Sequence, residues 1–294
     1  MKVLRSILFT PGNNMRMIQK IPTLIADAVV LDLEDSIPIA DKDTARVFIR
    51  DSLESAGSGS AEVYVRVNGL VTGFTAEDCS FVVQKGLAGI VLPKVESKKD
   101  VLESEKIIEQ MESERGLEDA TPLIATIETA KGVMNAYEIA SASQRVVAMG
   151  FGAVDYTRDM GTSLSKEGTE LFVPRSIVAI AAKAAGVQAL DTVFIDLADE
   201  QGLIKDSQTA RQLGFKGKFL IHPCQIDPVN KVFSPSLREV EYARKVASTF
   251  REAEAKGLGA TSLEGRMIDI PVHQQAKELI ALAEAIAEKE KKRE

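Results

Sequence analysis

Polar side chains stand at the ends of several short apolar runs in this sequence. In LDLED the carboxylates lie within an apolar segment, and ATIET repeats this pattern at Glu128. A buried carboxylate without a partner is costly, so these positions indicate a metal ion or an arginine partner. The residues at such run ends are Asp32, Glu34, Asp35, Arg66, Asn68, Lys94, Glu96, Glu128, Asp155, Asp196, Asp199 and His222.

The residue types in this set favour a hard cation. Carboxylates without a cysteine–histidine cluster are typical of Mg²⁺ sites, where one or two carboxylates leave the other positions to water and substrate oxygens. The two histidines, His222 and His273, lack the spacing of a zinc site. The sequence also contains no GxSxG, so Ser–His–Asp hydrolysis has little support.

Eight apolar runs separated by amphipathic stretches would have to position these residues. Continuous runs such as AVVLDL and GIVLP are typical of strands buried on both faces. Eight strand–helix units predict an α/β fold, a closed (βα)8 TIM barrel, with the active site at the carboxyl ends of the strands. A doubly wound open sheet is the alternative, but the sequence has neither GxGxxG after the first strand nor GxxxxGK[ST]. The predicted strands are Ser6–Pro11, Ala28–Asp35, Glu62–Asn68, Gly89–Val95, Pro122–Thr129, Arg145–Asp155, Asp191–Asp199 and Gly217–Pro223.

The pattern changes near residue 230. A charged helical stretch, a Gly-rich break (GLGATSLEG) and a second helix from Val272 follow one another. We therefore predict a TIM-barrel catalytic domain at residues 1–229 and a C-terminal helical extension at residues 230–294.

Composition excludes several classes of protein. The chain has 294 residues, 45% of them apolar, and a net charge of −7, which argues against a general nucleic-acid binder. Two cysteines, Cys79 and Cys224, fit a reducing compartment. No apolar run approaches the ~18 residues that span a bilayer, and MKVLRSILFT is too interrupted for a signal peptide. We expect a cytoplasmic protein with no membrane or nucleic-acid partner.

Several motifs occur in an order that is specific as a set: RSILFTPGN, LDLEDS with DKDTAR, VRVN, LPKVES, IETAKGV, GFGAVDYTRDMG, GTELF, IHPCQI and RMIDIPVHQQAK. In these motifs the sequence resembles the β-subunit of citrate lyase and its relatives, the citryl-, citramalyl- and malyl-CoA lyases. The resemblance covers nearly the whole chain. It implies a TIM barrel with helical C-terminal additions and a Mg²⁺-dependent carbon–carbon lyase. Such an enzyme cleaves a short β-hydroxyacyl-CoA to an acyl-CoA and a keto acid.

The resemblance also implies roles for individual residues. The metal ligands would be Glu128 and Asp155, and Arg66 would contact the thioester oxygen of the substrate. A fixed guanidinium is suited to the charge that develops on an enolate oxygen. The residues implied on the coenzyme A side are Arg5, Lys20 and the loop Pro11, Gly12 and Asn13.

Asp269 lies beyond the predicted barrel, in RMIDIPVHQQAK. From the sequence alone it fits a helix N-cap or first-turn acid, because Pro271 follows two residues later. The resemblance implies a catalytic role, in which this Asp transfers a proton in the active site of a neighbouring subunit. The extension would then contribute to a homo-oligomer, a trimer or hexamer.

Several alternatives stay open. A malyl-CoA thioesterase would use the same metal site to direct water, and a pyruvate-type aldolase would act on free hydroxy-keto acids. A citrate lyase complex β-subunit would act on an acyl-carrier-protein thioester. The sequence does not reveal which β-hydroxyacyl-CoA is the substrate.

Overall fold

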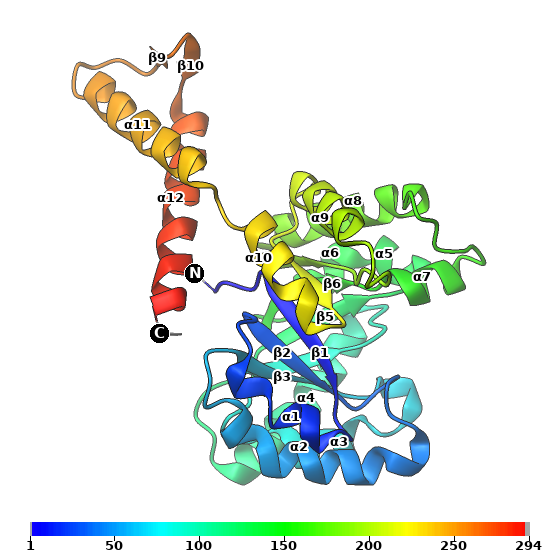
Figure 1. Cartoon of the computed structure of the whole chain (residues 1–294). Coiled ribbons are helices and arrows are strands. Elements are labelled where there is room, and N and C mark those ends of the chain that lie inside the picture. Colours follow the sequence, from blue (N-terminus) through cyan, green and yellow to red (C-terminus); the bar gives the residue numbers. More distant parts are fainter. Residues whose placement is uncertain (1, 292–294) are drawn as a thin grey trace. The chain divides into compact units, whose positions relative to one another are not determined.

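The computed structural model describes residues 2–291 and contains a closed barrel of eight parallel strands (Figure 1). The strands pair in chain order, and β1 pairs with both β2 and β8, which closes the barrel. The predicted TIM barrel is therefore confirmed, and the open sheet is excluded. The strands are β1 (Ser6–Pro11), β2 (Ala28–Asp32), β3 (Glu62–Arg66), β4 (Gly89–Leu92), β5 (Leu123–Ile127), β6 (Val146–Phe151), β7 (Gln188–Asp191) and β8 (Gly217–Leu220).

Helices alternate with these strands along the chain. Among residues 2–291, no helix is both long enough and apolar enough to cross a membrane. The helices up to residue 233 are α1 (Met15–Ile18), α2 (Lys42–Ala56), α3 (Thr75–Val82), α4 (Lys98–Arg115), α5 (Ala130–Met134), α6 (Ala136–Ala140), α7 (Ala153–Asp159), α8 (Phe172–Ala185), α9 (Glu200–Leu213) and α10 (Ile226–Phe233). Short 3-10 turns are η1 (Ile21–Thr23), η2 (Ile39–Asp41), η3 (Leu70–Thr72), η4 (Thr169–Leu171) and η5 (Pro223–Gln225).

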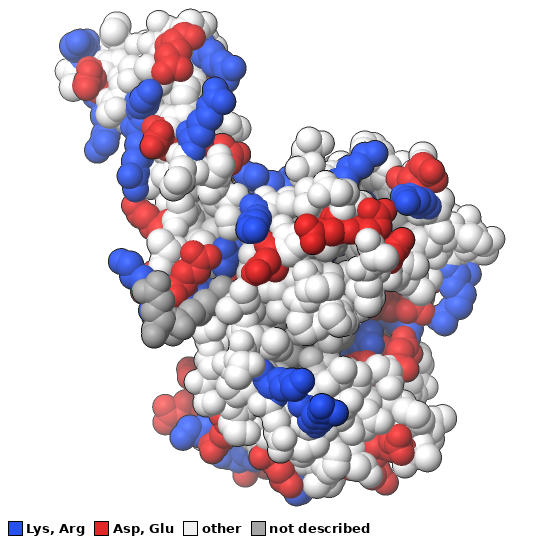
Figure 2. Space-filling view, viewed as in Figure 1, with Lys and Arg blue, Asp and Glu red and all other residues white. Residues whose placement is uncertain are grey.

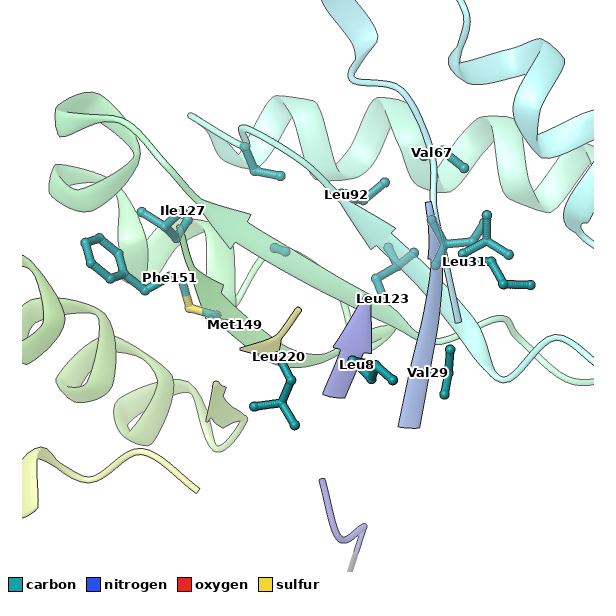
Figure 3. Close-up of a cluster of buried hydrophobic side chains, with 14 of the residues drawn as sticks. Leu8, Val29, Leu31, Val67, Leu92, Leu123, Ile127, Met149, Phe151 and Leu220 are labelled. Carbon is teal, nitrogen blue, oxygen red and sulfur yellow. The ribbon is translucent and has the colours of Figure 1, made fainter. Parts of the chain in front are cut away.

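The strands bury both of their faces, because successive side chains alternate between the barrel interior and the surrounding helices. Leu8, Val29 and Leu31 belong to the large cluster between strands and helices (Figure 3). Ile7 and Val30 belong instead to the smaller cluster inside the barrel. The alternation continues to the carboxyl ends of the strands and decides which polar side chains enter the barrel there.

Seven of the eight predicted strands have different bounds in the structure, and the first alone, Ser6–Pro11, agrees at both ends. The differences at strands six and seven change where polar residues lie. Strand seven is Gln188–Asp191, and most of the predicted range Asp191–Asp199 is a loop. Ile195 in this loop is 57% exposed, so its apolar type reflects neither strand pairing nor burial. Strand six ends at Phe151, which places Asp155 in the first turn of α7 instead of on a strand. Apolar runs indicate segments but do not fix where pairing stops.

The chain divides into two compact units, and the larger is Leu4–Phe233. The predicted boundary at 229/230 falls inside α10, because Val229 and Phe233 are buried in the large cluster of the barrel. The smaller unit contains α11 (Leu237–Glu254) and α12 (Ile270–Lys291), with Phe250 and Ile268 in its own core.

The predicted Gly-rich break of the smaller unit contains a hairpin. Strands β9 (Thr261–Leu263) and β10 (Arg266–Ile268) pair antiparallel. Glu264 and Gly265 join them with φ angles of 51° and 78°. Two positive φ angles in a two-residue loop are the geometry of a type I′ turn, which matches the twist of paired strands.

Candidate active site

Arg66 is the last residue of β3 and lies beside Asp32, the last residue of β2. Its Nε and Nη2 atoms each donate to an oxygen of Asp32 at 2.7 Å. Its guanidinium carbon also lies 4.8 Å from the ring centroid of Phe9. Burial opposes ionisation of Asp32, but the hydrogen bonds and charge of Arg66 hold the pKa of Asp32 below its usual value. The bidentate pair and the ring fix the guanidinium at the rim of the barrel.

Glu34 lies on the other side of the guanidinium. Its Oε2 is 3.0 Å from Nη1 of Arg66, and its Oε1 accepts a hydrogen bond from Nζ of Lys94. Burial raises the pKa of Glu34, although the two cations oppose this. Lys94 has a φ of 49°, which is uncommon for a residue with a side chain. The loop after β4 thus holds an unfavourable backbone conformation at the position where Lys94 reaches Glu34.

Glu128 follows β5 and is only 4% exposed. Its Oε2 atom is buried and has no hydrogen-bond partner. Burial, together with the negative charge of Glu34, raises the pKa of Glu128 to about 7. A Cβ atom at Gly152 would lie 2.7 Å from Cγ of Glu128. The glycine therefore leaves the space in which this carboxylate sits.

Asp155 lies in the first turn of α7, and its side chain is 19% exposed. One oxygen is 2.6 Å from Nη2 of the exposed Arg158, a pair that solvent weakens. Arg66, Glu128 and Asp155 line one cavity of about 190 Å³. The predicted substrate-contacting arginine and the two predicted metal ligands are thus brought together.

The donor set of this cavity fits Mg²⁺. A buried carboxylate oxygen without a partner and a second carboxylate nearby provide hard oxygen ligands. Within residues 2–291 no group of three or more His, Cys, Asp or Glu side chains is placed to enclose a metal. Two protein ligands leave positions for water and substrate oxygens, as Mg²⁺ sites commonly do.

The loop after β1 has a packing role in the structure. Gly12 is buried, and a Cβ atom there would lie 2.6 Å from both the Asp32 carbonyl oxygen and Cδ1 of Ile49. Asn13 donates a hydrogen bond from Nδ2 to Asp41 at 3.2 Å, and Pro11 is half-buried. Close contact of β1 with β2 therefore requires the glycine. A role of this loop beside coenzyme A remains a proposal.

The two cations predicted on the coenzyme A side have different environments. Lys20 is exposed and precedes η1, so it can meet a ligand from solvent. Arg5 is 2% exposed and donates from Nε and Nη2 to the carboxylate of Asp27 at 2.9 and 3.0 Å. It precedes β1 and therefore lies at the amino ends of the strands, opposite the cavity. Strand direction and the buried ion pair keep Arg5 away from the rim that holds the cavity. Its place on the coenzyme A side stays a prediction that this geometry does not support.

Asp269 lies in the smaller unit, immediately before α12. Its Oδ1 accepts a hydrogen bond from the Val272 amide at 3.1 Å, which is the geometry of a helix cap. The structure therefore shows the helix-cap contact that the sequence predicts for Asp269. Its role in proton transfer remains a proposal.

A larger cavity of about 750 Å³ lies among the loops that follow β2 to β5. Glu34 and Lys94 line it, whereas Glu128 and Asp155 do not, so we place the chemistry in the smaller cavity. On the face drawn in Figure 2, acidic and basic side chains are interspersed.

Sequence reasoning assigned no role to Gly152 or Thr192, although both line the smaller cavity. Nor did it pair Asp32 with Arg66. Side chains two residues apart on a strand share a face, and Val30, Tyr64 and Ile124 on β2, β3 and β5 lie inside the barrel. Asp32 and Arg66 come two residues after Val30 and Tyr64, so this alternation could have indicated the pair. No comparable signal marks Thr192, since the range of β7 was wrong.

The fold and the site define a class: TIM-barrel proteins with a carboxylate-lined cavity at the carboxyl ends of the strands. The chain belongs to the HpcH/HpaI aldolase/citrate lyase family, whose sequence pattern matches residues 5–223. This confirms the resemblance found in the sequence.

Individual relatives cover nearly the whole chain. The citrate lyase subunit beta of Leuconostoc mesenteroides subsp. cremoris is 42% identical, over 96% of this chain and 93% of that protein. Human mitochondrial citramalyl-CoA lyase is 36% identical, over 97% of this chain and 87% of that protein. Among solved structures, Mycobacterium tuberculosis CitE with magnesium, acetoacetate and coenzyme A has a TM-score of 0.77 at 30% identity, covering 96% of this chain and 98% of CitE.

Proposed function

We propose that this protein is a Mg²⁺-dependent carbon–carbon lyase that cleaves a short β-hydroxyacyl-CoA to an acyl-CoA and a keto acid. The observation that carries the proposal is the shared cavity of Arg66, Glu128 and Asp155, in which the Glu128 Oε2 has no hydrogen-bond partner. Relatives named citrate lyase subunit beta and citramalyl-CoA lyase support the reaction class. A related structure crystallised with magnesium and oxaloacetate supports the cofactor and a keto-acid ligand.

Glu128 and Asp155 would hold the metal ion. Bound there, Mg²⁺ would supply Lewis-acid polarisation and a template for the oxygens of the keto acid. In cleavage, the β-hydroxyl group would give its proton to solvent water and become the keto carbonyl. The bond between the α and β carbons breaks, and its electron pair forms the enolate of the acyl thioester. Arg66 would donate hydrogen bonds to the enolate oxygen, where negative charge develops.

Asp269 of a neighbouring subunit would protonate the enolate carbon and complete the acyl-CoA. The proposal therefore includes a homo-oligomer, a trimer or hexamer. Subunit exchange between inactive Asp269→Asn and inactive Glu128→Gln proteins should restore partial activity, because some sites then receive an intact metal site and an intact Asp from different chains. Absence of complementation despite demonstrated exchange would exclude the shared site.

A substrate panel tests the reaction. Malyl-, citramalyl- and citryl-CoA are incubated with Mg²⁺ or EDTA, and the products are separated by chromatography. We expect acyl-CoA and keto acid in Mg²⁺ and no turnover in EDTA. Free acid and thiol would show a thioesterase, and cleavage of a free hydroxy-keto acid alone would show an aldolase of the pyruvate type.

A second candidate is a citrate lyase complex β-subunit that acts on an acyl-carrier-protein thioester. The identities of 38–42% to proteins named citrate lyase subunit beta favour it. Retention of an acyl-carrier protein by the purified chain, with turnover of its thioester but not of the CoA ester, would establish this function.

A further inference from the structure

Helix α7 carries Asp155 but has no capping side chain of its own. Its N-cap residue is Gly152, which has no side chain to accept the free amides of the first turn. Residues that cap helices well, such as Ser, Thr, Asp and Asn, all have a Cβ atom. At Gly152 that atom would lie 2.7 Å from Cγ of Glu128. Accommodating Glu128 therefore excludes a local cap, and the helix start needs a partner from elsewhere in the chain.

Thr192, the residue directly after β7, provides this partner. Its Oγ1 accepts a hydrogen bond from the Ala153 amide at 2.9 Å, across 39 residues of sequence. Ala153 is the first residue of α7, and Thr192 is 3% exposed. Thr192 also lines the cavity that contains Glu128 and Asp155. Its hydroxyl thus accepts the first of the amides at the helix start that have no partner within the helix.

The backbone at Thr192 is held by a buried ion network. The preceding residue, Asp191, accepts hydrogen bonds from Nε and Nη2 of Arg175 at 2.9 and 2.7 Å. Lys218 on β8 donates to the same carboxylate, and both Asp191 and Lys218 are 0% exposed. A buried, fully paired network of this kind resists movement, because removing any partner leaves a buried charge. Thr192 therefore has a fixed position from which to hold α7.

We propose that Thr192 is a positioning residue for Asp155, and this inference rests on the proposed metal site. By fixing the Ala153 amide, the Thr192 hydroxyl sets the start of α7 and so the place of Asp155, two residues further along the helix. Thr192 does not itself coordinate the metal in this arrangement. Outer contacts that orient metal ligands typically change metal affinity by ~10–100-fold when they are removed.

The test compares Thr192→Val and Thr192→Ser with Thr157→Val as a matched control. Thr157 is a buried threonine on the same helix, and its hydroxyl donates to the Ala153 carbonyl at 2.9 Å, so this control loses a helix contact but keeps the cap. The affinity for the metal is measured as Mn²⁺ binding, which needs no turnover. Bound Mn²⁺ is followed by the loss of its free-ion EPR signal, and Mg²⁺ is then added to displace it. Thermal unfolding is measured in parallel.

We expect Thr192→Val to raise the metal Kd by ~10-fold or more, and Thr192→Ser and Thr157→Val to stay within about twofold of the unaltered protein. A lower Tm for Thr192→Val with an unchanged Kd would overturn the inference, because the contact would then be only structural. If Thr192→Val does not fold, Thr192→Ala and Thr192→Ser give the same comparison of hydroxyl loss and retention. Glu128→Gln separates the two failures: if it binds Mn²⁺ as the unaltered protein does, the proposed metal site itself is wrong.

Discussion

The buried carboxylate of Glu128 should make the metal-free protein less stable as the pH rises from 5 to 8. Its pKa is raised from 4.5 to about 7 in the folded chain. Between these values the folded state keeps a proton that the unfolded state has lost. The stabilisation from this proton is complete below pH 4.5 and is lost as the pH rises through about 7. At ~1.4 kcal/mol for each pKa unit, the full effect on the free energy of unfolding is ~3 kcal/mol.

The variant Glu128→Gln isolates this charge. Burying the amide has its own cost of ~1–3 kcal/mol, but that cost does not depend on pH. We therefore expect the stability of the variant, relative to the unaltered protein, to increase by ~2–3 kcal/mol between pH 5 and pH 8 in EDTA. Urea unfolding followed by circular dichroism measures this difference.

A difference that stays constant with pH would refute the reasoning, because the carboxylate would then ionise alike in both states. Mg²⁺ provides the second arm of the experiment at pH 8. A ligand that binds only the folded state stabilises it by mass action, so Mg²⁺ should stabilise the unaltered protein and not the variant. Equal stabilisation of both proteins would contradict the assignment of Glu128 as a ligand.

Two further predictions concern the cavity, and a third concerns the two cysteines. Arg66→Ala should lower kcat by ~10²–10³-fold with little change in KM. Arg66→Lys should restore only part of the lost kcat, because a point charge lacks the planar donor fork of arginine. A change in KM alone would show that Arg66 binds the ground state. Gly152→Ala should weaken Mg²⁺ binding, because the added Cβ would lie 2.7 Å from Cγ of Glu128. The control Gly259→Ala, which has no atom within 4 Å of the added carbon, should bind Mg²⁺ normally. A thiol reagent should label only the exposed Cys224 in the folded chain and both thiols in urea, because Cys79 is buried and its pKa is raised to about 12; rapid labelling of two thiols without urea would contradict this.

The sequence determined the architecture because the pattern that specifies a parallel barrel is local. Each strand is buried on both faces and therefore reads as a continuous apolar run, as in Ala28–Asp32. Strand direction follows from the order of these runs, so residues that end them must share one rim. That reasoning places Arg66 and Glu128 at one rim, and the structure shows both in one cavity, which Asp155 reaches from the first turn of α7.

The motifs added the family and the residue assignments, but not the environment of each residue. Arg5 and Arg66 are both arginines next to apolar runs. The predicted strands already put Arg5 before its strand and Arg66 near the end of its own. Only the structure shows that Arg5 is buried against Asp27, while Arg66 faces the cavity. A resemblance between motifs carries residue types from one protein to another, whereas burial depends on which strand end a residue occupies.

Tertiary structure alone decided how the metal-binding side chains are held. The range of β7 was misjudged because the apolar letters of Ile195 and its neighbours are the same in an exposed loop as in a buried strand. The space that Gly152 leaves for Glu128, and the cap that Thr192 supplies to Ala153, join residues 24 to 39 positions apart. Such contacts depend on distances of a few ångströms between separate strands, and no local pattern in one sequence encodes them.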